Sequence, residues 1–250
     1  MSAGLLAALG LVALVTSVIS AVTGVAGGVL VLSGLLLLVP ATAVVPLHGA
    51  VQATASVTRV AAFRQHVRWD IVWRFVVGVL PGSILGVLLV AALASIDTRV
   101  IKLLIAVAIL LSLFGHKLKL DAAPRSMRLF YAVGLVVGFF GVVAGSTGPI
   151  VTQALLLFDV KKEEHVATKS VVQAIGHGIK IPLFGLAIGF DFGPWLVPLG
   201  LMAVGIVAGT LLGKRLLASM SADRFVIVAR VLLALVVLQV AVSELWGLVA

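Results

Sequence analysis

Two runs of polar residues interrupt otherwise apolar sequence, and both runs have helical spacing. The first is His48, Gln52, Ser56 and Arg59, and the second is Lys169, Gln173, His177 and Lys180. Positions i, i+4, i+8 and i+11 lie on one side of an α-helix, so each run predicts a polar face. Amide side chains suit an oxyanion, and the flanking cations raise the local concentration of anions. These residues therefore predict a binding site for a small anion.

Each of these side chains also has a simpler interpretation. Arg59 and Lys180 lie near predicted helix ends, where a long basic side chain can extend to lipid headgroups. Lys169 can mark the cytoplasmic end of its helix, a His can hydrogen-bond a neighbour, and the Gln amides can bond between helices. The repetition of a whole polar face favours the site, because polar groups inside a membrane are costly and are candidates for function.

Two glycine-rich breaks supply a second kind of anion-binding group. Glycine weakens a helix and proline cannot continue one, so each break separates two helical segments. The sequence Ser146-Thr147-Gly148-Pro149 predicts the start of a half-helix, whose free N–H groups would face the membrane interior. Gly27 and Gly28 would act similarly but without a hydroxyl cap; close helix packing is the alternative. For the spacings Gly82–Gly86 and Gly205–Gly209 we interpret the glycines as packing residues only.

The rest of the chain must hold these groups inside a membrane. Of 250 residues, 62% are hydrophobic and 11% are charged, whereas a soluble domain carries about a quarter charged residues. This composition excludes a cytosolic enzyme, a disordered protein and a nucleic-acid-binding protein. The net charge of +9 is then a sign of membrane topology. Because cysteine is absent, disulfides and thiolate chemistry are excluded. We predict no catalytic residue, metal or cofactor.

The apolar segments predict an all-α polytopic membrane protein. A spanning helix needs about 20 apolar residues. Six segments of suitable character are Val44–Phe63, Ile71–Ala94, Val100–Gly115, Val166–Leu186, Trp195–Leu217 and Phe225–Leu245. Two longer segments, Gly4–Val39 and Leu129–Phe158, are predicted to be broken, re-entrant-like hairpins. The segment Gly4–Val39 lacks the basic region of a cleavable signal peptide, so we assign it to the mature fold.

Basic residues predict the orientation of these segments. They cluster around residues 59–74, 117–128, 161–162 and 214–224, which we assign to cytoplasmic loops. Both termini then lie outside the cytoplasm.

The two halves of the chain resemble each other. Arg59-Val-Ala-Ala-Phe63 matches Lys180-Ile-Pro-Leu-Phe184 at an offset of 121, and Asp70 pairs with Asp191 at the same offset. We predict one repeat over residues 1–120 and a second over 121–250, each with one hairpin and three transmembrane helices. Because the number of segments per repeat is odd, the second repeat is inverted, as in many secondary transporters. Gln52 and Gln173 would then meet near the membrane centre.

The ordered motifs resemble the TauE/SafE family of sulfite and organosulfonate exporters. The resemblance is carried by Gly24–Gly28, the Pro40 loop, Val67-Arg68-Trp69-Asp70, Leu80–Gly86, Gly138–Pro149 and Ala167-Thr168-Lys169-Ser170. It implies export of a small sulfur oxyanion, such as sulfite or sulfoacetate, across the cytoplasmic (inner) membrane of a bacterium.

The residues and this resemblance together predict alternating access, with the lipid bilayer and a small anion as partners. His48 and His177 are candidates for proton coupling, because imidazole ordinarily changes charge near neutral pH. A uniporter driven by the membrane potential is also consistent with the sequence, as is a homodimer. Two other classes remain open: an anion channel, and an integral-membrane enzyme acting on lipid phosphates. The enzyme is disfavoured, because no carboxylate is available to orient a Ser146–His177 pair.

Overall fold

The computed structural model describes residues 2–24, 27–93, 126–143, 148–178, 180–182, 185, 189–232 and 235. Every regular element in these residues is helical. The elements are α1 (Ala3–Thr23), α2 (Gly27–Leu38), α3 (Ala41–Phe63), η1 (Arg64–His66), α4 (Trp69–Leu93), α6 (Leu129–Val143), α7 (Gly148–Leu157), α8 (Lys162–Gly178), α9 (Lys180–Pro182), η4 (Gly193–Trp195) and α10 (Leu196–Ala218). Residues 222–232 are also helical.

Contacts divide the chain into two compact units. The first comprises Met1–Val67 and Lys161–Val226, and the second comprises Arg68–Val160 and Ile227–Ala250. Each unit takes residues from both halves of the sequence, so these units are not the two predicted repeats. The repeat boundary at residue 120 lies outside the described residues and stays a prediction.

The first predicted hairpin is two helices with a break between them, as expected. α1 ends at Thr23 and α2 begins at Gly27. Gly24 caps α1 with a φ of +66°, in the left-handed region that favours glycine, and its N–H donates to the carbonyl of Ser20 at 2.8 Å. The interruption therefore follows from the backbone conformation that Gly24 allows.

α3 begins earlier than predicted. It starts at Ala41, directly after Pro40, whereas the predicted span started at Val44, and it includes Pro46. Proline lacks the N–H that would bond to the carbonyl of Thr42, but that loss falls in the second turn and interrupts only one backbone bond. The buried contacts of Val44 and Leu47 hold this turn against the core of the first unit.

The predicted span Val166–Leu186 is wrong at its start. α8 begins at Lys162, because Glu163 and Glu164 occupy its first turn, where acidic side chains complement the positive end of the helix. α8 is described to Gly178 and α9 covers Lys180–Pro182. Residue 179 and residues 183, 184 and 186 of the predicted span lie outside the described residues.

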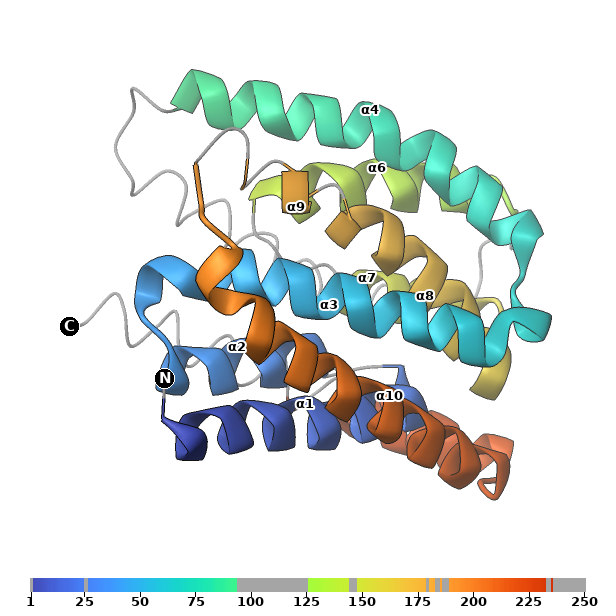
Figure 1. Cartoon of the computed structure of the whole chain (residues 1–250). Coiled ribbons are helices and arrows are strands. Elements are labelled where there is room, and N and C mark those ends of the chain that lie inside the picture. The colour runs from blue at the N-terminus through green and yellow to red at the C-terminus, as the bar shows by residue number, and fades with distance from the viewer. Residues whose placement is uncertain are drawn as a thin grey trace. The chain divides into compact units, whose positions relative to one another are not determined.

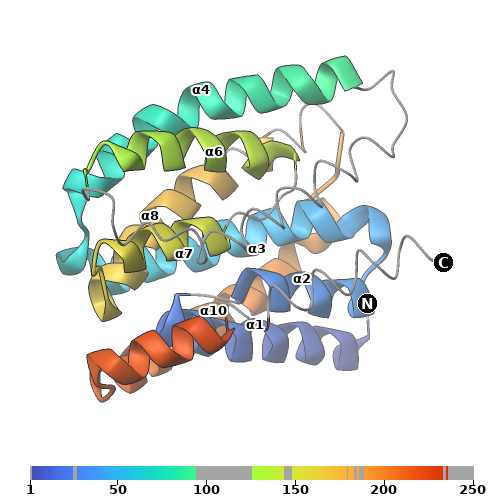
Figure 2. The same ribbon diagram turned by 180° about the vertical axis from the view of Figure 1, so that it is seen from behind.

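Glycines allow two pairs of helices to pack closely, one pair in each unit. In the first unit α1 lies beside α10, and in the second α4 lies beside α6 (Figures 1 and 2). A Cβ on Gly209 would lie 2.3 Å from the carbonyl oxygen of Leu14, and one on Gly82 would lie 2.1 Å from that of Leu135. The interpretation of Gly82, Gly205 and Gly209 as packing residues is confirmed.

Apolar side chains cover the outside of these helices. Leu11, Ile84 and Val204 are each more than 60% exposed. Among the described residues, three stretches are long and apolar enough to cross a membrane, namely Ala3–Thr23, Trp69–Gly86 and Gly193–Ala218. The chain is therefore a membrane protein with several spanning helices. The predicted span Val100–Gly115 lies outside the described residues, as does most of Phe225–Leu245 beyond residue 232.

Candidate functional site

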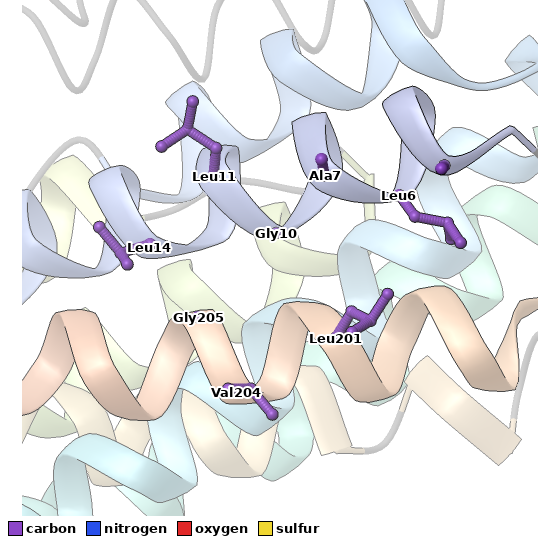
Figure 3. A pocket seen from close by; sticks show the side chains of 9 residues that line it. Leu6, Ala7, Gly10, Leu11, Leu14, Leu201, Val204 and Gly205 are labelled. Atoms are coloured by element: carbon purple, nitrogen blue, oxygen red, sulfur yellow. The ribbon is translucent and has the colours of Figure 1, made fainter.

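A groove between α1 and α10 is not suited to bind an ion. It has a volume of about 570 Å³ and is lined only by alanine, glycine, leucine and valine, including Leu11, Leu14 and Val204 (Figure 3). It offers a small anion no charged side chain and no polar side chain. The chemistry-bearing residues of the first unit lie instead on α3 and α8, which pack against each other.

The predicted polar face of α3 is entirely buried. His48, Gln52, Ser56 and Arg59 have exposed fractions of 7%, 2%, 0% and 2%. Helical spacing places them on one side of α3, and the packing of α2 and α8 against α3 covers that side. Four polar groups in succession are therefore removed from the surface.

The N-terminal part of this face, His48 and Gln52, contacts the first turn of α2. His48 Nε2 donates to the carbonyl of Gly28 at 3.0 Å, since a carbonyl can only accept. Gln52 Nε2 donates to the carbonyl of Gly27 over a longer distance of 3.5 Å. Gly27 also packs tightly on α1, because a Cβ there would lie 2.5 Å from the Cβ of Ser20. Gly27 thus has the packing role that the sequence left as an alternative, together with a contact to the polar face.

Arg59 is bound by two hydroxyl groups. Its Nη2 donates to Ser56 Oγ at 3.1 Å, and its Nε donates to Ser170 Oγ of α8 at 3.1 Å. Ser56 precedes Arg59 by one turn, so the guanidinium points back along α3 rather than beyond its end. The side chain is 2% exposed. The alternative that Arg59 extends to lipid headgroups is therefore wrong.

Lys169 is the second buried cation. It is 3% exposed, and its ammonium group donates to the carbonyl of Gly24 at the end of α1. A lysine that only marks a cytoplasmic helix end would be exposed to water or headgroups. Among the described residues, the buried polar side chains include Arg59 and Lys169 but no aspartate or glutamate. Two buried basic side chains therefore lie on the packed helices α3 and α8.

Three further predicted site residues, His177, Gln173 and Lys180, belong to α8 and α9. The imidazole rings of His48 and His177 meet edge to face, with centroids 5.8 Å apart and an interplanar angle of 84°. Gln173 is partly exposed, and its predicted meeting with Gln52 stays a prediction. Lys180 begins α9, and its side chain lies outside the described residues.

Most of the second glycine-rich break lies outside the described residues. Ser146 and Thr147 lie outside the described residues. α7 begins at Gly148 with Pro149 in its first turn, where the sequence predicted a helix start. Gly148 belongs to the second unit, and its role in anion binding stays a prediction.

Sequence reasoning missed two participants. Ser170 is buried and bonds to Arg59, and the carbonyl of Gly24 accepts from Lys169. Ser170 lies three residues before Gln173 and seven before His177, so the same helical spacing could have identified it. A backbone acceptor such as the Gly24 carbonyl leaves no signal in residue type.

Within the described residues, no cluster of three or more His, Cys, Asp or Glu side chains could hold a metal ion. The chemistry that this cluster supports is binding of an anion by a guanidinium, an ammonium, an amide and imidazoles.

Comparison with known proteins gives one match. The family described as "Sulfite exporter TauE/SafE" matches residues 9–240, which includes both glycine-rich breaks and both polar helices. Neither a curated protein nor a solved structure matches the chain significantly. The chain therefore belongs to the TauE/SafE family of sulfite exporters.

Proposed function

We propose that this protein is a secondary transporter that exports a small sulfur-containing oxyanion, such as sulfite or sulfoacetate, across the bacterial cytoplasmic membrane. Family membership supports the transport of sulfite or a related compound. The cluster on α3 and α8 supports an anion as cargo. We place both chain termini outside the cytoplasm, as the basic loops predict.

The observation that carries this proposal is the pair of buried cations, Arg59 and Lys169. A buried charge is costly unless it is paired. Hydroxyl groups hold Arg59, and in the described part of the chain it forms no ion pair. A permanent carboxylate partner would neutralise Arg59, whereas hydroxyl groups leave its charge for a partner that arrives and leaves. A transported anion is such a partner.

We also infer that the chain is an inverted repeat. If α1 corresponds to α6 and α4 to α10, the two close helix pairs are reciprocal: α1 packs on α10, and α6 packs on α4. The paired aspartates occupy similar positions. Asp70 lies in the first turn of α4, and Asp191 accepts from the N–H of Gly193 at 2.8 Å, just before α10. A two-fold relation between halves would produce both patterns.

In the proposed mechanism, α3 and α8 each present one polar face to the anion, and rocking of the repeats exposes the anion to either side of the membrane. Lys169 attracts the anion, and Arg59, Gln52, Gln173 and the amides at Ser146–Gly148 bind its oxygens. An inside-negative potential favours anion exit by about 2.3 kcal/mol per charge per 100 mV. The potential alone can therefore drive export.

His48 and His177 are proposed to couple protons to this transport. The two imidazole rings come from different halves of the chain, and they are in contact. An imposed pH gradient should accelerate sulfite flux by the wild type but not by His48→Ala or His177→Ala. A flux that follows only the membrane potential would instead identify a uniporter.

The proposed function is tested by sulfite and sulfoacetate flux in proteoliposomes. Gln52→Ala and Gln173→Ala should each reduce flux at least about tenfold, the cost of losing a hydrogen bond to a charged group. Gln65→Ala is the matched control, because Gln65 is exposed in η1. Wild-type flux in both site variants would reject the site, and no sulfite or sulfoacetate flux by the wild type would reject the function. Flux that fails to saturate or to show counter-transport would indicate a channel.

A further inference from the structure

The guanidinium of Arg59 is held along one edge. Nε and Nη2 lie on the same side of the planar group, and they donate to Ser170 and Ser56 respectively. A guanidinium has five N–H hydrogens, and the two hydroxyls engage two of them. The other three hydrogens are on Nη1 and Nη2. We call the side of the guanidinium formed by these two nitrogens its end edge. Among the described residues, none accepts from these three hydrogens.

The two hydroxyl groups fix the direction of that end edge. Ser170 donates its own hydrogen to the carbonyl of Val166 at 2.6 Å, so a lone pair of its oxygen remains for Arg59. Ser56 and Ser170 are 0% and 1% exposed, which excludes competing water from outside. One serine comes from α3 and the other from α8. The guanidinium is therefore oriented by both helices before any ligand binds.

We infer that Ser56 and Ser170 are positioning residues that hold Arg59 so that its end edge recognises two oxygens of a tetrahedral or pyramidal oxyanion. This inference rests on the proposed function and adds the residues that orient the anion-binding group. Sulfite and sulfonate groups carry several oxygens on one sulfur, and two of them can accept parallel bonds from Nη1 and Nη2. Lysine could supply the charge but not this planar pair of donors.

Kinetics of sulfite transport test the inference. Ser56→Ala and Ser170→Ala each remove one oxygen atom, and the freed guanidinium must then be ordered when the anion binds. We expect the KM for sulfite to rise about tenfold, with kcat changed by less than about twofold. Ser170→Thr keeps the hydroxyl and should restore the KM. Arg59→Lys should raise the KM at least about tenfold, because the charge remains but the bidentate edge is lost.

Thr58→Ala is the matched control on α3. Its hydroxyl donates only to the carbonyl of Thr54 one turn earlier, at 2.9 Å, and we expect wild-type kinetics. A wild-type KM in both serine-to-alanine variants would overturn the inference. So would a lower kcat at unchanged KM, which would indicate a merely structural role, or a wild-type KM in Arg59→Lys.

Direct binding separates this inference from the proposed function. Calorimetric titration of sulfite into purified protein should give a dissociation constant that rises about tenfold in Ser170→Ala and in Arg59→Lys. If the wild type binds sulfite more tightly than both variants but transports none, recognition by the end edge is supported and the transport proposal fails. If the wild type transports sulfite but the variants bind it as tightly as the wild type, recognition by the end edge is wrong and the transport proposal stands.

Discussion

The ammonium group of Lys169 donates a hydrogen bond to the carbonyl of Gly24, the residue that caps the C-terminal end of α1. The last carbonyls of a helix lack partners within the helix and carry the negative end of its dipole. This contact therefore gives a buried cation a partially negative partner without an acidic side chain. It also joins the glycine-rich break to the polar face of α8.

Replacing Lys169 by methionine should separate transport from stability. The side chains have similar size, and removing a buried charge in favour of an apolar group is often neutral for folding. We expect sulfite flux to fall at least about tenfold, because the anion loses a charge-assisted contact. Lys214→Met is the matched control, since Lys214 is exposed and also donates to a backbone carbonyl, that of Ala62. Equal flux in both variants would contradict a role for Lys169.

Gly24→Ala should destabilise the protein. A left-handed backbone costs an L-residue about 1–2 kcal/mol, and the new Cβ would lie 2.8 Å from Cδ2 of the buried His165. We expect a lower midpoint of thermal unfolding in detergent. Gly10→Ala lies within the same helix with no atom within 4 Å of its Cβ, so its midpoint should stay level or rise. A Gly24→Ala midpoint equal to that of Gly10→Ala would show that the strain is absent.

The local features of the site could be predicted from sequence, but its tertiary contacts could not. Helical periodicity predicted that His48, Gln52, Ser56 and Arg59 share a face, because that relation depends only on the geometry of one helix. The same geometry cannot say which residue of another helix meets Arg59. Ser170 was missed because its contact depends on how α8 packs on α3.

Element ends show the same division. The break after Thr23 followed from the conformational limits of glycine. The start of α8 did not follow, because Lys161–Glu164 was interpreted as a charged loop. In the structure Glu163 and Glu164 stabilise a helix start instead. A short charged stretch fits either role, and packing of the following residues decides between them.

Asp191→Ala should weaken the turn that leads into η4. Asp191 Oδ1 accepts from the N–H of Gly193, the first residue of η4, and loss of such a hydrogen bond costs about 1 kcal/mol. We therefore expect the midpoint of thermal unfolding to fall by a few degrees. Asp191→Asn keeps an acceptor oxygen at the same place and should remain near the wild type. Equal destabilisation by both substitutions would instead assign the effect to the negative charge.

The reciprocal helix pairs make the last prediction. Gly82→Ala places a methyl group against the carbonyl of Leu135, and Gly209→Ala places one against the carbonyl of Leu14. Backbone atoms cannot yield as a flexible side chain can, so each helix pair must separate, at a cost of about 1–3 kcal/mol typical of overpacking. Both variants should lower the thermal midpoint by similar amounts.

Gly200→Ala, in α10 with no atom within 4 Å of its Cβ, is the control and should not lower the midpoint. If the two halves are related by a two-fold axis, Gly82 and Gly209 occupy equivalent positions. The two substitutions should then lower the stability of the protein by similar amounts. Destabilisation by only one of the two substitutions would contradict that equivalence and, with it, the inverted repeat.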